Sequence, residues 1–180
     1  MIRIAELAVA SYVVGSLPIA RLAPKPREAG VLPLWVRGVL IGADVVKGVL
    51  AMSLVGASAN PYAQALAATA VVAGQQWPLW TSVREERGLA VAAGALTLIT
   101  PIAVPAWAVL WAIGYVVSGY LTVGTAAATA LLPFVIGYFA GWPFGLVALP
   151  VCLLILERHR DGLRRIFAGG AQKHYWRRGA

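Results

Sequence analysis

The chain alternates between long apolar runs and short polar connections from Ile4 to Leu156. A helix needs about 20 predominantly apolar residues to cross the hydrocarbon core of a membrane. Glycine, proline and charged residues separate the runs at intervals near that length. The pattern therefore predicts seven transmembrane helices, over residues 4–22, 32–55, 62–80, 89–99, 104–121, 123–140 and 144–156.

Two of these runs, the fourth and the seventh, are short for a span. The count falls to six if residues 89–121 bend at Pro101 and Pro105 as a re-entrant pair. Small residues recur at four-residue spacing in Gly38-x-x-x-Gly42 and in Gly137-x-x-x-Gly141-x-x-x-Gly145. This spacing places them on one helix face and is typical of helices that pack closely in a membrane.

The basic residues favour seven spans over six. Thirteen of the fifteen Lys and Arg lie in residues 21–37, 84–87 and 158–165 and in the tail from Lys173, whereas the other connections carry no charge. Loops rich in Lys and Arg stay in the cytoplasm. Seven spans place every basic cluster on that face, with the amino terminus outside and the carboxyl terminus inside, whereas six would separate the 84–87 turn from the tail.

Composition supports a membrane protein of the all-α class. The chain is 60% hydrophobic and 12% charged, whereas a soluble domain has about 25% charged residues. The net charge of +8 would lie on one membrane face against anionic lipid headgroups, so we do not expect nucleic acid as a partner. Two histidines are too few for a protein zinc cluster. We interpret residues 1–180 as a single integral membrane domain with a short basic cytoplasmic tail, 158–180.

Asp44 and Lys47 are the first candidates for chemistry, because both lie inside the second predicted span. An isolated charge there costs at least about 2.5–3.5 kcal/mol. At positions i and i+3 the two side chains can meet on one helix face. They form either an ion pair that lowers its own cost or the wall of a cavity open to the cytoplasm.

Three further polar segments could bind anions. Arg87 precedes a predicted helix, whose free N–H groups could bind a phosphate with it, although a solvated turn would look the same. Hydroxyls in residues 118–125 could bond to substrate oxygens or cap the following helix. Residues 158–165 carry four arginines, which attract anions or simply form the basic flank of a span.

Together these segments form an ordered series of short motifs along most of the chain. They are Tyr12-x-x-Gly15-Ser16-Leu17-Pro18, Asp44-x-x-Lys47-Gly48, Gly74-x-x-Trp77-Pro78 with Arg87-Gly88-Leu89-Ala90, Thr122-Val123-Gly124-Thr125, and Arg158-His159-Arg160 with Arg165. The series resembles the bacterial acyl-phosphate-dependent glycerol-3-phosphate acyltransferases. Members of that family are small seven-span inner-membrane enzymes that begin phospholipid synthesis.

The resemblance implies transfer of an acyl group from acyl phosphate to the 1-hydroxyl of glycerol 3-phosphate, with no cofactor or metal, in a multi-pass protein of the bacterial inner membrane. The implied partners are membrane lipids and the two substrates. The implied catalytic residues are His159, Arg87 and Thr125. The implied substrate-binding residues are Lys47, Asp44, Arg165, Arg160, Thr122 and Ser16.

The chain also departs from the family pattern where phosphate would bind. The loop at residues 23–33 has no serine, threonine or asparagine, Gln75 replaces a histidine, Glu85 and Glu86 replace two glycines, and Gly162 replaces an asparagine. These changes leave open a catalytically inactive family scaffold that serves as a lipid-binding or accessory subunit of a larger membrane complex. A small transporter is disfavoured, because the spans show no convincing inverted repeat.

Overall fold

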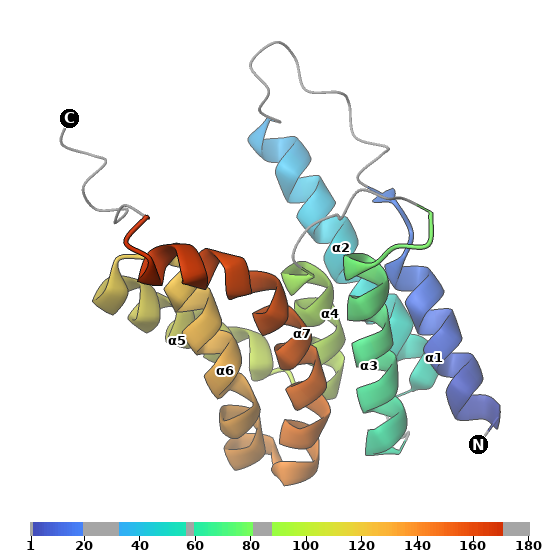
Figure 1. The fold of residues 1–180 in the computed structure, drawn as a ribbon. Coiled ribbons are helices and arrows are strands. Elements are labelled where there is room, and N and C mark those ends of the chain that lie inside the picture. The colour runs from blue at the N-terminus through green and yellow to red at the C-terminus, as the bar shows by residue number, and fades with distance from the viewer. Residues whose placement is uncertain (1, 20–32, 57–59, 81–87, 171–180) are drawn as a thin grey trace. The chain divides into compact units, whose positions relative to one another are not determined.

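The regular structure is helical throughout the part of the chain that the computed structural model describes, residues 2–19, 33–56, 60–80 and 88–170 (Figure 1). This confirms the all-α class. The seven helices of these residues are α1 (Ile2–Gly15), α2 (Leu34–Val55), α3 (Pro61–Gln76), α4 (Leu89–Ile99), α5 (Ala103–Ser118), α6 (Leu121–Ala140) and α7 (Trp142–Phe167).

Proline explains where two helices end before the predicted limit. α1 ends at Gly15 rather than Leu22, shortly before Pro18, and α3 ends at Gln76, two residues before Pro78. A proline lacks the N–H that would continue the helix, and it disfavours helical dihedrals in the residue before it. α4 covers the predicted residues, and α2 and α6 begin within two residues of the prediction.

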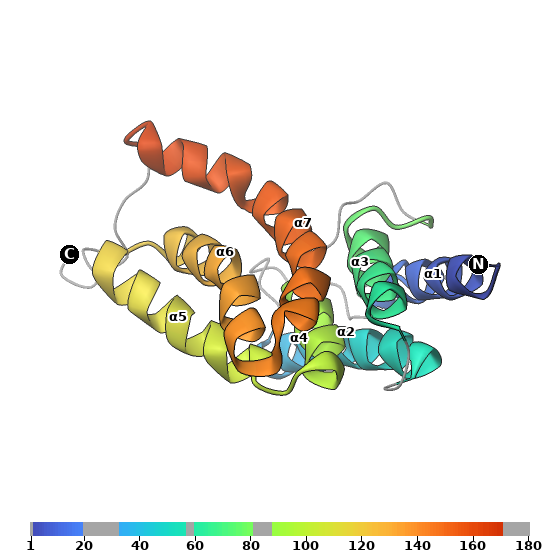
Figure 2. The same ribbon diagram turned by 90° about the horizontal axis from the view of Figure 1, so that it is seen from below.

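α7 is longer than its predicted span of 144–156, because the helix continues to Phe167. Its apolar run ends at Leu156, but Glu, Arg and Leu are strong helix formers and extend it through the charged segment. Figures 1 and 2 show that this second part turns away from the direction of the first. The predicted tail of 158–180 therefore begins inside a helix.

Three helices in the described residues are long and apolar enough to cross a membrane: α2, α6 and α7. Residues 4–15, 89–99 and 103–118 form shorter apolar helices. α4 and α5 are separate helices, joined through Thr100, Pro101 and Ile102. The count of seven crossings stays a prediction.

The helices fall into two compact units, Met1–Ile99 (unit 1) and Thr100–Ala180 (unit 2). The interpretation as a single domain stays a prediction. In unit 1, α1 packs against α3, and α2 packs against α4 and α3 (Figures 1 and 2). The buried residues at these contacts are mainly alanine and valine, for example Ala51, Ala67, Val71 and Ala95. Small side chains let the helix backbones approach closely.

In unit 2, α6 packs against both α5 and α7 (Figure 2). A Cβ atom on Gly145 of α7 would lie 2.6 Å from the carbonyl oxygen of Pro133 and 3.0 Å from the Cα atom of Gly137. The predicted close packing is thus confirmed for Gly137 and Gly145. For Gly38 and Gly42 it stays a prediction, because a Cβ atom there would have no neighbour within 4 Å in the described structure.

Candidate functional site

Two of the charged residues of α2, Asp44 and Lys47, form a buried network with a side chain of α3. Lys47 Nζ lies 3.0 Å from Asp44 Oδ1, which confirms that the two meet on one helix face. Lys47 Nζ also donates a hydrogen bond to Gln75 Oε1 at 2.9 Å. Gln75 Nε2 donates in turn to Asp44 Oδ1 at 3.3 Å. The network therefore joins all three side chains, and it spans the contact between α2 and α3.

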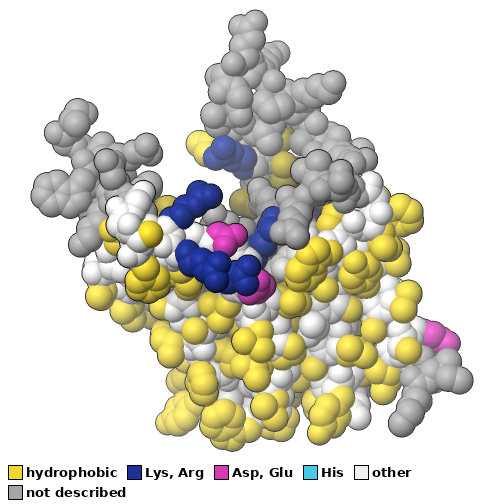
Figure 3. All heavy atoms as spheres, viewed as in Figure 1, with side chains coloured by type: hydrophobic (Ala, Val, Ile, Leu, Met, Phe, Trp, Pro, Cys, Tyr) yellow, Lys and Arg dark blue, Asp and Glu magenta, His cyan; other side chains and the backbone are white. Residues whose placement is uncertain are grey.

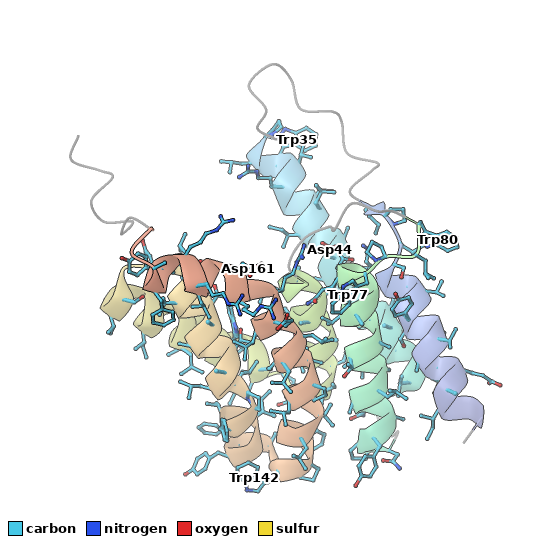
Figure 4. All side chains as sticks on the ribbon, in the orientation of Figure 1. Trp35, Asp44, Trp77, Trp80, Trp142 and Asp161 are labelled. Atoms are coloured by element: carbon cyan, nitrogen blue, oxygen red, sulfur yellow. The ribbon has the colours of Figure 1, made fainter. Side chains whose placement is uncertain are left out.

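This network is closed off from solvent. Lys47 is 2% exposed, Gln75 is 3% exposed and Asp44 is 9% exposed. Figure 4 shows Asp44 on α2, near the end of α3 that carries Trp77. A buried ion pair is tolerated when further hydrogen bonds satisfy its remaining donors and acceptors, and the amide of Gln75 supplies one of each kind.

Ser16, which directly follows α1, lies beside the same end of α3. It is fully buried, and its Oγ donates to the carbonyl oxygen of Tyr12 at 2.8 Å. A Cβ atom on Gly74, the residue before Gln75, would lie 3.1 Å from Ser16 Oγ. Tyr12 Oη donates to the carbonyl oxygen of Trp77 at 2.6 Å. Three predicted substrate-binding residues, Ser16, Asp44 and Lys47, thus surround residues 74–75.

Arg87 lies outside the described residues, as do Glu85 and Glu86. The described structure resumes at Gly88, whose φ of +71° lies in the left-handed region that favours glycine. A Cβ atom on Gly88 would lie 3.5 Å from Gln76 Nε2. α4 then begins at Leu89, as the sequence predicts.

The polar segment before α6 is organised by Ser118. Its Oγ donates to the carbonyl oxygen of Gly114 at 2.6 Å and accepts from the N–H of Tyr120 at 3.2 Å. Tyr120 is the N-cap of α6, and its side chain makes no capping bond. Thr122 and Thr125 lie within the first turns of α6 rather than at its cap, so the capping alternative is wrong for both.

The two threonines differ in their surroundings. Thr125 is buried, and its Oγ1 donates to the carbonyl oxygen of Leu121 at 3.0 Å. This bond uses the hydroxyl proton and leaves the oxygen able to accept a hydrogen bond. Thr122 lies against α7, where a Cβ atom on Gly162 would be 3.0 Å from its methyl carbon and 3.6 Å from its hydroxyl oxygen.

His159 lies on the buried side of α7. It is 2% exposed, and its Nδ1 lies 2.8 Å from the carbonyl oxygen of Ile155. A carbonyl oxygen only accepts hydrogen bonds, so Nδ1 carries the proton in the neutral ring. That tautomer makes Nε2 the basic nitrogen.

Three of the four arginines of α7, Arg160, Arg164 and Arg165, are exposed. Arg160 Nη1 is 3.0 Å from Glu157 Oε1, and Arg160 Nε is 3.9 Å from Asp161 Oδ1. Arg165 is exposed and has no carboxylate within ion-pair distance among the residues described. In Figure 3 basic and acidic side chains gather at this end of α7. In Figure 4 Trp142 lies at the start of α7 and Asp161 lies in its second part.

The structure identifies two residues that the sequence reasoning did not select. Gln75 was interpreted only as the loss of an ionisable group, yet it completes the buried network. Arg37 is an exposed cation on α2, seven residues before Asp44, and it has no ion pair within the described chain. Seven residues are nearly two helical turns, so both lie on one face of α2. The seven-residue spacing from Asp44 is therefore a feature of the sequence that indicates Arg37 as a candidate site residue.

Comparison with known proteins identifies the family. A family model described as glycerol-3-phosphate acyltransferase matches residues 33–169. The chain is 34% identical over 137 residues to glycerol-3-phosphate acyltransferase 2 of Moorella thermoacetica, an alignment covering 75% of this chain and 70% of that protein. It is 32% identical over 190 residues to the glycerol-3-phosphate acyltransferase of Actinobacillus pleuropneumoniae serotype 5b, covering 96% of each.

The fold has a counterpart among solved structures. The crystal structure of PlsY, an integral membrane glycerol 3-phosphate acyltransferase, in its lysophosphatidic acid form matches with a TM-score of 0.77. The match covers 95% of both chains at 21% sequence identity. The family model alone spans well over half of the sequence, and so this chain belongs to the glycerol-3-phosphate acyltransferase family.

Proposed function

We propose that this protein is a membrane acyltransferase that transfers an acyl group from acyl phosphate to the 1-hydroxyl of glycerol 3-phosphate. The observation that carries the proposal is the family match over residues 33–169. That range includes every predicted site residue except Ser16. The likeness to PlsY supports the fold on which the activity would rest.

The reaction exchanges one carbon–oxygen bond for another. The 1-hydroxyl oxygen attacks the acyl carbon, the bond from that carbon to the phosphate oxygen breaks, and inorganic phosphate leaves. The hydroxyl proton passes to a base or to the departing phosphate. Acyl phosphate is already a good electrophile, so positioning of the hydroxyl and neutralisation of phosphate charge can supply much of the rate.

The hydrogen bonds of unit 2 support definite roles for two residues. The Thr125 hydroxyl donates its hydrogen bond to the carbonyl oxygen of Leu121, so its oxygen would accept a hydrogen bond from the substrate hydroxyl. The hydrogen bond between His159 Nδ1 and the carbonyl oxygen of Ile155 fixes the ring. The basic Nε2 would then relay a proton or orient the substrate. Arg87, Arg160 and Arg165 would neutralise phosphate charge, and Thr122 would contact substrate oxygens.

The unit 1 residues contribute differently in this proposal. Lys47 is buried and its charge is balanced by Asp44, so the pair would support the phosphate site rather than bind phosphate at its surface. Ser16 would support the same end of α3. Arg37 and Arg165 are exposed cations with no described ion pair, and such groups are available to phosphate.

We infer a multi-pass protein of the bacterial inner membrane that crosses it seven times, with the amino terminus outside and the carboxyl terminus in the cytoplasm. The aromatic residues support this arrangement, because Trp35, Trp77 and Trp142 lie at helix ends and are exposed (Figure 4). Tryptophan is enriched where membrane meets water. The α7 end with Asp161 would then face the cytoplasm.

The topology is tested by labelling single cysteines from one side of the membrane after Cys152→Ala removes the native thiol. Cysteines at Ser82 and Ala180 should react only from the cytoplasmic side. Cysteines at Asn60 and Gly141 should react only from the outer side. Reaction of positions 82 and 180 from opposite sides would overturn the seven-span proposal.

The activity is tested in a bacterial strain whose own glycerol-3-phosphate acyltransferase is repressed. Expression of this chain should restore growth, and the substitution Thr125→Val should restore it less well. No growth, with the protein shown to be present in the membrane fraction, contradicts the proposal. Stable co-purification with other membrane proteins in that case would support an accessory subunit instead.

A further inference from the structure

The amide of Gln75 matches both charges of the buried pair. Its carbonyl oxygen accepts from Lys47 Nζ at 2.9 Å, and its amino group donates to Asp44 Oδ1 at 3.3 Å. A carboxylate at position 75 would repel Asp44, and a cation would repel Lys47. An aliphatic side chain would leave both charges without this partner, and desolvated charges are costly when unpaired.

The network lies at the contact between α2 and α3. In the half of α2 before Asp44, a Cβ atom on Gly38 or Gly42 would meet no described atom within 4 Å. The anchor residues Asp44 and Lys47 lie beyond that half, and Gln75 ties them to α3. The network therefore contributes, together with the packing of α2 against α4, to the direction in which the first half of α2 projects.

That first half of α2 carries Arg37. It lies on the same face as Asp44, about 10 Å away along the helix axis, and is exposed with no ion pair in the described residues. A small change in how α2 sits against α3 would move this cation. We propose that Gln75 is a positioning residue of the acyl transfer, acting through Lys47 and Asp44 to hold α2 in register against α3. The inference rests on the proposed function.

The test exchanges the amide and the carboxylate of the network. Gln75→Glu alone adds a second buried carboxylate, and Asp44→Asn alone leaves Lys47 without its counter-charge. The double variant D44N/Q75E restores a network with no net charge. In it, the carboxylate at position 75 accepts a hydrogen bond from Lys47, and the amide at position 44 donates a hydrogen bond to that carboxylate. The control is Glu6→Gln, which removes an exposed carboxylate from α1 of the same unit.

We expect each single variant to lower kcat/KM by at least about tenfold, equal to about 1.4 kcal/mol, mainly through a higher KM for glycerol 3-phosphate. Each should also lower the apparent Tm in detergent by roughly 5 °C or more. The double variant should recover most of both losses, and the control should match wild type. If a single variant does not accumulate, recovery of protein and activity in the double variant gives the same evidence.

Two results would overturn the inference. A double variant no more stable than the weaker single variant would show that the three side chains are not coupled. Recovery of Tm without recovery of activity would show that Gln75 or Asp44 acts on the substrate directly rather than by positioning. An inactive wild type would instead contradict the proposed function, and the Tm values would still report the coupling in the network.

Discussion

Gly48 of α2 and Gly94 of α4 face each other across the contact between their helices. A Cβ atom on Gly48 would collide with the carbonyl oxygen of Val91, and one on Gly94 with the carbonyl oxygen of Val45. Val91 lies three positions before Gly94, and Val45 lies three positions before Gly48. Gly15 of α1 and Gly74 of α3 repeat the arrangement with the carbonyls of Val71 and Tyr12.

This relationship explains why motif glycines occur in the middle of helices. A glycine inside a soluble helix destabilises it by about 1 kcal/mol relative to alanine. At these positions the missing side chain lets two backbones approach closely, as in small-residue packing of membrane helices. Gly48 directly follows Lys47, and Gly74 directly precedes Gln75. The same close contacts therefore hold the buried network in place.

Alanine at Gly94 should destabilise the protein, because the new methyl group would meet backbone rather than a movable side chain. Overpacking of this kind costs about 1–3 kcal/mol or more. The measurement is the apparent Tm in detergent, which we expect to fall by several degrees. Gly42→Ala on α2 is the matched control and should leave the Tm nearly unchanged, since no atom of the described residues lies within 4 Å of the added methyl group. Equal shifts for the two variants would contradict the packing account.

Removal of the Tyr12 hydroxyl should weaken the tie between α1 and the end of α3. Tyr12→Phe loses the 2.6 Å hydrogen bond to the carbonyl oxygen of Trp77, a change worth about 0.5–1.5 kcal/mol. Thermal unfolding should show a modest loss of stability. Tyr62→Phe tests the same chemical change at an exposed side chain. A loss as large for position 62 would mean that the hydroxyl of Tyr12 has no special role.

Trp107 and Thr129 should be energetically coupled in unit 2. Trp107 Nε1 donates to Thr129 Oγ1 at 3.1 Å, and Thr129 is buried. Thr129→Val and Trp107→Phe should each lower the Tm, because each leaves a polar partner unsatisfied. The double variant should lose less than the sum of the two, by about 0.5–3 kcal/mol. Strictly additive losses would show that the bond contributes little.

Thr125 should affect catalysis more than stability if its oxygen accepts a hydrogen bond from the substrate hydroxyl. Thr125→Val removes one hydroxyl from α6, and we expect a loss of about tenfold in kcat/KM, equal to about 1.4 kcal/mol. Thr125→Ser retains the hydroxyl and should keep most of the activity. If the Thr125→Val and Thr125→Ser variants have similar activity, the hydroxyl of Thr125 does not contribute to catalysis.

Arg165 should contribute more to glycerol 3-phosphate binding than Arg160. Arg160 already contacts Glu157 and Asp161, whereas Arg165 has no carboxylate within ion-pair distance in the described chain. A hydrogen bond to a charged group is worth about 1.5–3 kcal/mol. Arg165→Gln should therefore raise KM by about tenfold or more, and Arg160→Gln should raise it less. The opposite order in steady-state kinetics would show that the α7 ion pairs do not limit Arg160.

The sequence predicts the helical class, the helix order and the placement of Asp44 and Lys47 on one helix face, because these depend on local periodicity and spacing. It leaves open whether the two form an ion pair, which the structure shows. It predicted the wrong end for α7, since hydropathy follows the apolar run and not the propensity of the charged residues that continue the helix.

Contacts between distant segments were not accessible from the sequence. Gln75 meets Asp44 across 31 residues, and Tyr12 meets Trp77 across 65 residues. No local pattern records such a contact. Compared with the family pattern, the sequence shows at Gln75 only the absence of a histidine, whereas the structure shows an amide that bonds both members of an ion pair.

The central claim is tested most directly by incubating the purified protein with acyl phosphate and isotopically labelled glycerol 3-phosphate. Mass spectrometry should detect labelled 1-acyl-glycerol 3-phosphate, formed in a one-to-one ratio with inorganic phosphate and absent when either substrate is omitted. Phosphate release without the labelled product, or no turnover by correctly folded protein, would contradict the assignment as an acyltransferase.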